Sequence, residues 1–169
     1  IEPHCCAGAS RDASGGGRRV PFRLTAACKS GLRGCGKLPE PTRCPDCGAV
    51  FRNGRWTWGP APEGANEENC PACRRVHDRF PAGYVELHGE FLAGHRDEVL
   101  QLARNREAKE KAEHPLERIM GVEAVDGGVL ITTTDTHLAR DIGEALHSAY
   151  KGELEYHYNK EENLLRVHW

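Results

Sequence analysis

Hydrophobic and polar positions in the C-terminal half of the chain follow periods that predict alternating strands and helices. Val85 and Leu87 alternate with more polar neighbours, as in a short strand with one buried face. Residues 95–113 and 136–150 instead carry apolar side chains three and four positions apart, the spacing of an amphipathic helix. Asp135 directly precedes the second segment, where an aspartate is a favourable helix N-cap. We therefore expect two helices in this half.

Four further segments are rich in β-branched, aromatic or alternating residues and predict strands. The first two flank Asp126-Gly127-Gly128, a strong hairpin signal. Together with the first strand, the order is β-α-β-β-α-β-β, which predicts an α+β sandwich of the split-βαβ kind. Both helices would lie on one face of a mostly antiparallel sheet. The four segments are residues 119–125, 129–134, 153–158 and 164–169.

The N-terminal segment, residues 1–43, has neither the helical nor the strand period. It carries eight Lys or Arg and three Asp or Glu, and it includes three consecutive glycines. We expect a disordered basic arm, which could contact a phosphate backbone. Its four cysteines lack the C-x2-C spacing of a metal site, and we expect free thiols there. They are Cys5, Cys6, Cys28 and Cys35.

Two C-x2-C motifs define a central module, residues 44–82, which precedes an α+β domain at residues 83–169. The motifs are Cys44-Pro-Asp-Cys47 and Cys70-Pro-Ala-Cys73. Two such turns can supply the four tetrahedral thiolate ligands of one Zn²⁺ ion and leave no open coordination position. The spacing therefore predicts a zinc ribbon whose single zinc ion is structural rather than catalytic.

A pair of redox dithiols is the main alternative for these cysteines. A redox C-x-x-C motif should open a helix. Proline and glycine surround both motifs, so we expect neither of them to begin a helix, which favours zinc. His77 lies four residues after Cys73 and could replace one ligand, but we leave it out of the predicted ligand set.

The segment between the motifs predicts a hairpin with its turn at Asn53-Gly54. Trp56 and Trp58 would then point to one face of the returning strand. Two interpretations follow. The indoles could form a stacking platform for unpaired bases, flanked by Arg52 and Arg55. They could instead cover the metal site, and we favour this interpretation because so small a module has little other core.

Composition narrows the classes of function. The chain has 169 residues and a formal net charge of −2, which excludes a strongly basic nucleic-acid coat. The sequence has no run of 18 apolar residues that could span a membrane, and it has no signal segment that would indicate secretion. We therefore expect a cytoplasmic protein. The nine histidines are scattered and no nucleophile lies beside a base, so we expect no enzymatic activity.

The motifs, in their linear order, resemble one known family. A cysteine pair, a tryptophan-bearing hairpin, a second pair, a strand and a later aspartate-glycine turn before a helix are similar to the zinc-binding portion of the large-ribosomal-subunit export adaptors. This is the nonsense-mediated mRNA decay protein "NMD-three" family. The resemblance covers about residues 44–169. It is carried by CPDCGAVFRNGRWTW, CPACRRVHDRF, YVELHG and VDGGVLITTTDTHLARDIGEAL.

The resemblance implies that the four cysteines of the two motifs bind zinc, that Trp58 matches the family's hairpin tryptophan, and that the protein binds the large ribosomal subunit without catalysis. We expect a short stand-alone relative, because the family's further cysteine pairs and downstream domains have no counterpart in this sequence. We do not transfer nuclear export.

Charge limits where RNA could bind, because residues 44–169 carry fifteen basic and twenty-two acidic residues. We expect a local RNA contact, while a basic protein could instead bind the acidic C-terminal sheet. A zinc-stapled protein-interaction module without RNA binding is one alternative, and a thiol or zinc enzyme is a weaker one. The predicted RNA- or partner-binding residues are Arg52, Arg55, Trp56, Trp58, Arg74 and Arg75, together with the N-terminal arm.

Overall fold

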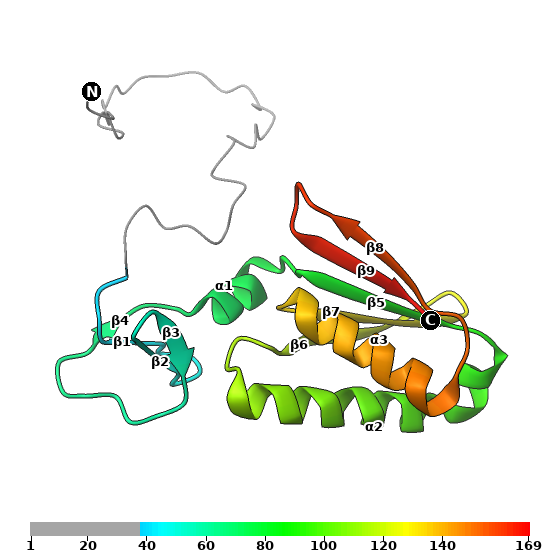
Figure 1. The fold of residues 1–169 in the computed structure, drawn as a ribbon, viewed down its shortest axis with the longest axis horizontal. Helices are drawn as coiled ribbons and strands as arrows, with labels where there is room; N and C mark the ends of the chain where they lie inside the picture. Colours follow the sequence, from blue (N-terminus) through cyan, green and yellow to red (C-terminus); the bar gives the residue numbers. More distant parts are fainter. Residues whose placement is uncertain (1–37) are drawn as a thin grey trace, which may run out of the picture.

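The computed structural model describes residues 38–169 of the chain (Figure 1). Most of the predicted basic arm, with its four cysteines, therefore lies outside the described residues. Residues 38–43 do not continue the arm as expected. Leu38 packs against the hydrophobic cluster around the cysteines, and Thr42 is fully buried in a short strand. The folded part thus begins before residue 44, and we call residues 38–82 the cysteine module.

The cysteine module contains a four-stranded sheet with the order β3-β2-β1-β4. Its central hairpin turns at Asn53 and Gly54, which both have positive φ angles, 52° and 74°. This confirms the predicted hairpin, because a two-residue turn of this kind requires left-handed backbone at both positions. The strands are β1 (Thr42–Arg43), β2 (Val50–Arg52), β3 (Arg55–Thr57) and β4 (Asn66–Glu67).

One helix of the module, α1 (Pro71–Asp78), was not predicted. Cys70 is its N-cap, and Pro71 occupies its first turn. The expectation that neither cysteine motif begins a helix is therefore wrong for the second motif. Proline is favourable in a first helical turn, because its missing N–H would have no intrahelical partner there. Pro71 thus starts a helix at a position where we expected an irregular turn.

The remaining residues, 83–169, form what we call the sheet unit. It has a five-stranded sheet with the order β6-β7-β5-β9-β8, in which only the β5–β9 pair is parallel. The expected mixture of α and β structure is confirmed, and so is the order of elements along the chain. They are β5 (Gly83–His88), α2 (Glu90–Glu113), β6 (Ile119–Val125), β7 (Gly128–Thr133), α3 (Thr136–Tyr150), β8 (Glu155–Asn159) and β9 (Leu164–His168).

Two helices cover one face of this sheet (Figure 1). Helix α2 begins five residues earlier than predicted and is kinked at His95. Helix α3 begins directly after Asp135, whose carboxylate accepts a hydrogen bond from the backbone N–H of His137 at 2.7 Å. The predicted N-cap is therefore confirmed. Between helices and sheet lies a core of fully buried aliphatic side chains: Val85, Leu87, Val99, Ile131, Leu138, Ile142, Leu146 and Val167. In the described part of the chain, no helix is long and apolar enough to cross a membrane.

Candidate metal centre

Four cysteine sulfur atoms converge in the cysteine module. Their Sγ atoms all lie within 4.8 Å of one another, and none of the four residues forms a disulfide. The Sγ atoms of Cys47 and Cys70 are 3.7 Å apart. Four sulfurs at ~2.3 Å from a tetrahedral zinc ion would be about 3.8 Å from each other. The cluster, Cys44, Cys47, Cys70 and Cys73, is therefore compatible with one zinc ion.

The first motif is held as a tight loop by two backbone hydrogen bonds. The N–H of Cys44 donates to the carbonyl of Ala49 at 2.8 Å, and that of Gly48 donates to the carbonyl of Cys44 at 2.9 Å. Gly48 has a φ of 78°, a conformation that favours glycine. This loop turns the sulfur atoms of Cys44 and Cys47 toward the same centre.

The second motif places its sulfurs through the start of α1. The backbone N–H of Cys70 points at the Sγ of Cys44 at 3.3 Å, and that of Cys73 points at the Sγ of Cys70 at 3.4 Å. Burial opposes ionisation of Cys44, but hydrogen bonds from the backbone of Cys70 and then of Cys47 outweigh it and lower its pKa to about 7. Burial raises the pKa of Cys70. Because metal ligation requires thiolates, backbone donors favour the bound state.

A fifth residue, Arg118, reaches the cluster from the other half of the chain. Its Nη1 lies 3.3 Å from the Sγ of Cys73, and its Nη2 lies 3.5 Å from the Sγ of Cys70. Burial would lower the pKa of Arg118, but the neighbouring sulfur atoms raise it. Sequence reasoning missed this residue, since no spacing rule connects an arginine to cysteines 45 and 48 positions away.

The two tryptophans have different environments. Trp56 is 9% exposed and belongs to the cluster formed with the cysteines, which supports the interpretation that it covers the site. Trp58 lies beyond the end of β3 and is 39% exposed. Its indole N–H donates to the carbonyl of Lys111 at the end of α2, at 2.6 Å. The expectation that both indoles cover the metal site, or together form one platform, is therefore wrong.

The four arginines predicted to bind a partner also differ in their environments. Arg52 and Arg55 are exposed and directly opposite each other across the hairpin. Arg74 pairs with Glu68 at 2.8 Å. Arg75 is only 9% exposed, and its guanidinium donates to the carbonyl of Phe80 at 3.2 Å, so it is not available to a partner at the surface.

His77 is outside the cluster, as the predicted ligand set requires. Its Nε2 contacts a carboxylate oxygen of Asp46 at 2.7 Å. Both side chains are substantially exposed to solvent. Among the described residues, only the four cysteines converge closely enough to hold a metal ion.

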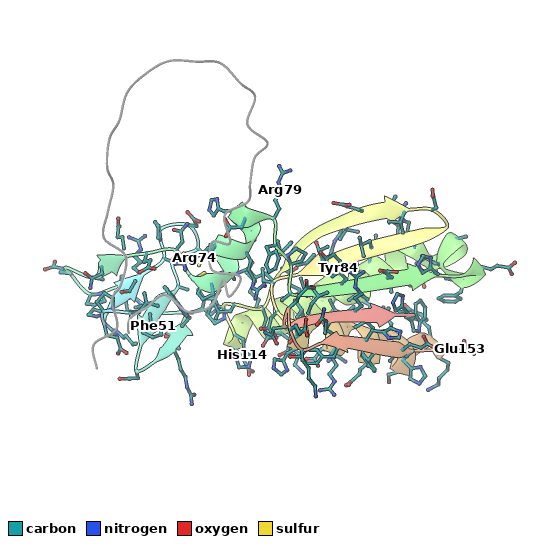
Figure 2. All side chains as sticks on the ribbon, turned by 90° about the horizontal axis from the view of Figure 1, so that it is seen from above. Phe51, Arg74, Arg79, Tyr84, His114 and Glu153 are labelled. Carbon is teal, nitrogen blue, oxygen red and sulfur yellow. The ribbon has the colours of Figure 1, made fainter. Side chains whose placement is uncertain are left out.

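A shallow hollow of about 310 Å³ lies where the cysteine module meets the sheet unit. It is lined by Arg55 and Trp56 from the hairpin and by residues 114–117 of the α2–β6 connection. Figure 2 shows His114 at this junction, between the two parts of the molecule. Burial, and then repulsion from Asp135, raise the pKa of Glu117.

No family model matches the chain, and comparisons with curated proteins and with solved structures found no match either.

Proposed function

We propose that this chain is a zinc-binding adaptor without catalytic activity, in which a zinc ribbon is followed by an α+β sandwich. The convergence of four thiols on one point carries the proposal. Four protein ligands complete the tetrahedral coordination of zinc, so no position is open for a substrate or for an activated water molecule. In this role zinc stabilises the fold, and function belongs to the surfaces that the fold presents.

The proposed partner is the large ribosomal subunit or its RNA, as the sequence resemblance implies. Arg52 and Arg55 support this proposal, because both are exposed and they occupy paired positions on the hairpin that follows the first cysteine motif. Arg74 extends the set from α1, although Glu68 partly neutralises it. We omit Arg75 and Trp56 because both are buried. Trp58 stays in the set because it is 39% exposed and an aromatic side chain can stack with a base.

Charge confines this contact to the cysteine module and the N-terminal arm. Residues 83–169 carry ten Lys or Arg and seventeen Asp or Glu, a net charge of −7. Such a surface repels phosphate. Residues 1–37 carry seven basic and two acidic residues and could add to the attraction for RNA.

One observation favours the alternative, a protein-interaction module with a basic partner. The strand register places Glu123, Leu130, Glu86, His168 and Glu155 in one row across all five strands of the large sheet. The row lies on the face opposite to the helices, since the neighbouring positions Val85, Ile131 and Val167 are the buried ones. Three carboxylates in one row would suit a basic protein segment.

Sedimentation with purified large ribosomal subunits across a salt series tests the proposal. The variant carries Arg52→Ala, Arg55→Ala and Arg74→Ala. The matched control replaces three exposed arginines on the helices of the sheet unit, Arg96, Arg104 and Arg140, by alanine. Each lost phosphate contact should reduce the slope of log affinity against log salt by roughly 0.7 to 0.9. We expect weaker binding and a flatter slope in the variant only.

A second arm of the experiment uses ribosomal RNA stripped of protein. If neither probe binds the wild-type chain, or if the variant and the control lose binding equally, the RNA proposal is wrong. If binding instead disappears when Glu123, Glu86 and Glu155 are changed to Gln, the protein-interaction alternative is correct.

A further inference from the structure

The connection between α2 and β6 is the part of the sheet unit that contacts the cysteine module, and Arg118 lies at the end of this connection. The backbone of Arg118 belongs to the sheet unit. Its N–H donates to the Oγ1 of Thr134 at 2.9 Å, and its carbonyl accepts from the N–H of Thr134 at 2.9 Å. Thr134 is only 4% exposed and also donates to the carbonyl of Leu116 at 2.6 Å. The base of the Arg118 side chain is therefore fixed relative to the large sheet.

The guanidinium of Arg118 belongs to the environment of the sulfur cluster. Its Nε donates to the carbonyl of Pro115 at 2.7 Å, which orients the planar group. The two remaining nitrogens then face Cys73 and Cys70, at 3.3 and 3.5 Å. All three nitrogens thus have acceptors, and two of the acceptors are predicted metal ligands.

Arg118 has no ordinary counter-ion in the described part of the chain, where no carboxylate forms an ion pair with it. A half-buried guanidinium normally requires a paired anion. A zinc ion with four thiolate ligands carries a net charge of about −2, which follows from the charges of the ligand set. The metal–thiolate complex would therefore supply the missing anion.

We propose that Arg118 is the counter-ion of the zinc–thiolate complex and that metal binding thereby fastens the sheet unit to the cysteine module. The inference rests on the proposed zinc site. Hydrogen bonds from outside the coordination sphere stabilise and orient metal ligands, and removing one typically weakens metal binding 10- to 100-fold. Conversely, metal loss removes the fixed acceptors of Arg118 and loosens the contact of the connection, residues 114–118, with the cysteine module.

Leu116 and Trp58 add to the same contact. Leu116 packs against the hydrophobic cluster of the cysteines. The indole of Trp58 donates to the carbonyl of Lys111, just before the connection begins. These contacts are neutral, so they position the connection but cannot balance the charge of the complex. Among these three residues, only Arg118 contacts the sulfur atoms themselves through charged donors.

The test compares wild type, Arg118→Met, Arg118→Lys and the control Arg104→Met, each as the whole chain. Arg118→Met keeps the length of the side chain but removes the charge and the donors, whereas Arg118→Lys keeps the charge. Cobalt replaces zinc as a spectroscopic probe, and zinc affinity is measured by competition with a chromophoric chelator. Hydrogen exchange at residues 116–119 is followed with and without metal.

We expect Arg118→Met to bind zinc 10- to 100-fold more weakly. Its sulfur-to-cobalt charge-transfer band should move to lower energy, because hydrogen bonds to sulfur stabilise the donor electrons. Arg118→Lys should restore part of both effects. Metal removal should accelerate exchange at residues 116–119 in wild type and should do so less in Arg118→Met, in which the contact with the sulfur atoms is already lost. The Arg104→Met control should match wild type.

The possible failures are distinct. If wild type forms no cobalt–thiolate band, the proposed zinc site is wrong and this inference falls with it. If wild type binds cobalt but Arg118→Met has the same spectrum and the same zinc affinity, the zinc site stands and the role of Arg118 is refuted. The spectrum reports the sulfur environment directly, so a general loss of stability cannot imitate the expected shift.

Discussion

Replacing Cys44 with serine should unfold the cysteine module while the sheet unit remains folded. Cys44 is fully buried and belongs to the sulfur cluster, and its removal leaves three ligands for the metal. The module has few other sources of stability. Val50 and Trp56 are its only large hydrophobic side chains below 10% exposure, while Ala49 and Ala72 are small.

The magnitudes favour the metal as the main stabilising element. Burying one large hydrophobic side chain stabilises a fold by about 1.5–3 kcal/mol, so two of them contribute about 3–6 kcal/mol. Structural zinc sites contribute about 10–16 kcal/mol in small zinc-finger peptides. The sheet unit does not depend on the metal in this way, because several fully buried aliphatic side chains form its core. The free energy lost with zinc should therefore exceed the free energy that the buried side chains of the module contribute.

Hydrogen exchange followed by mass spectrometry measures this difference. The amides of Cys44, Gly48 and Glu68 are hydrogen-bonded within the module and report its unfolding. A loss of 5 kcal/mol accelerates their exchange several thousand-fold, since each 1.4 kcal/mol is a factor of ten. Amides in the β5–β7 pair should change little. Cys28→Ser is the matched control, because we predict no metal ligand at that position.

Two results would refute this reasoning. Equal loss of protection in both parts would mean that they unfold as one cooperative domain, and the predicted boundary at residue 82 would be wrong. Unchanged protection in the module would mean that the metal is not its main source of stability.

Three further substitutions test the packing and the charges. Gly143→Ala should destabilise the sheet unit by about 1–3 kcal/mol in urea unfolding, because the new Cβ would lie 2.7 Å from a buried methyl group of β9. In the control Gly94→Ala the new Cβ meets nothing within 4 Å, so this variant should be neutral or stabilising. Glu117→Gln should raise the melting temperature at pH 7. Folding raises the pKa of the Glu117 carboxyl, so the fold loses stability as the pH rises from the unfolded to the folded pKa of this group. The variant should lack this decline in stability above pH ~4.3. Arg75→Met should cost about 1–3 kcal/mol by thermal unfolding, because the carbonyl of Phe80, just after α1, loses its donor. The exposed ion pair lost in Arg74→Met should cost under about 1 kcal/mol.

Local sequence patterns were sufficient to predict the elements of the sheet unit. The alternation around Val85 predicted β5, and the turn at Asp126-Gly127-Gly128 matched the hairpin between β6 and β7. These signals concern neighbouring residues, so they need no tertiary information. The strand order is different, because the central strand β5 pairs with β7 and β9, which lie far from it in the sequence. The hydrophobic pattern of β9 fits several positions in a sheet and cannot select one.

The metal ligands could be predicted, but their surroundings could not. The C-x2-C spacing brings sulfurs together within each turn, and the two turns then need only to meet. Arg118 and the separate environments of Trp56 and Trp58 depend on how the cysteine module docks against the sheet unit. The burial of Arg75 could not be predicted for the same reason, because it depends on the path of the chain after α1, which brings the carbonyl of Phe80 to the guanidinium.

The zinc content of the purified chain tests the four-thiolate centre most directly. Elemental analysis of protein prepared without chelator should give one zinc per wild-type chain, about none in Cys44→Ser or Cys70→Ser, and one in Cys28→Ser. Wild-type protein with four reduced thiols in the module and no bound metal would contradict the zinc site. Two zinc ions per chain, with one lost in Cys28→Ser, would contradict the ligand assignment.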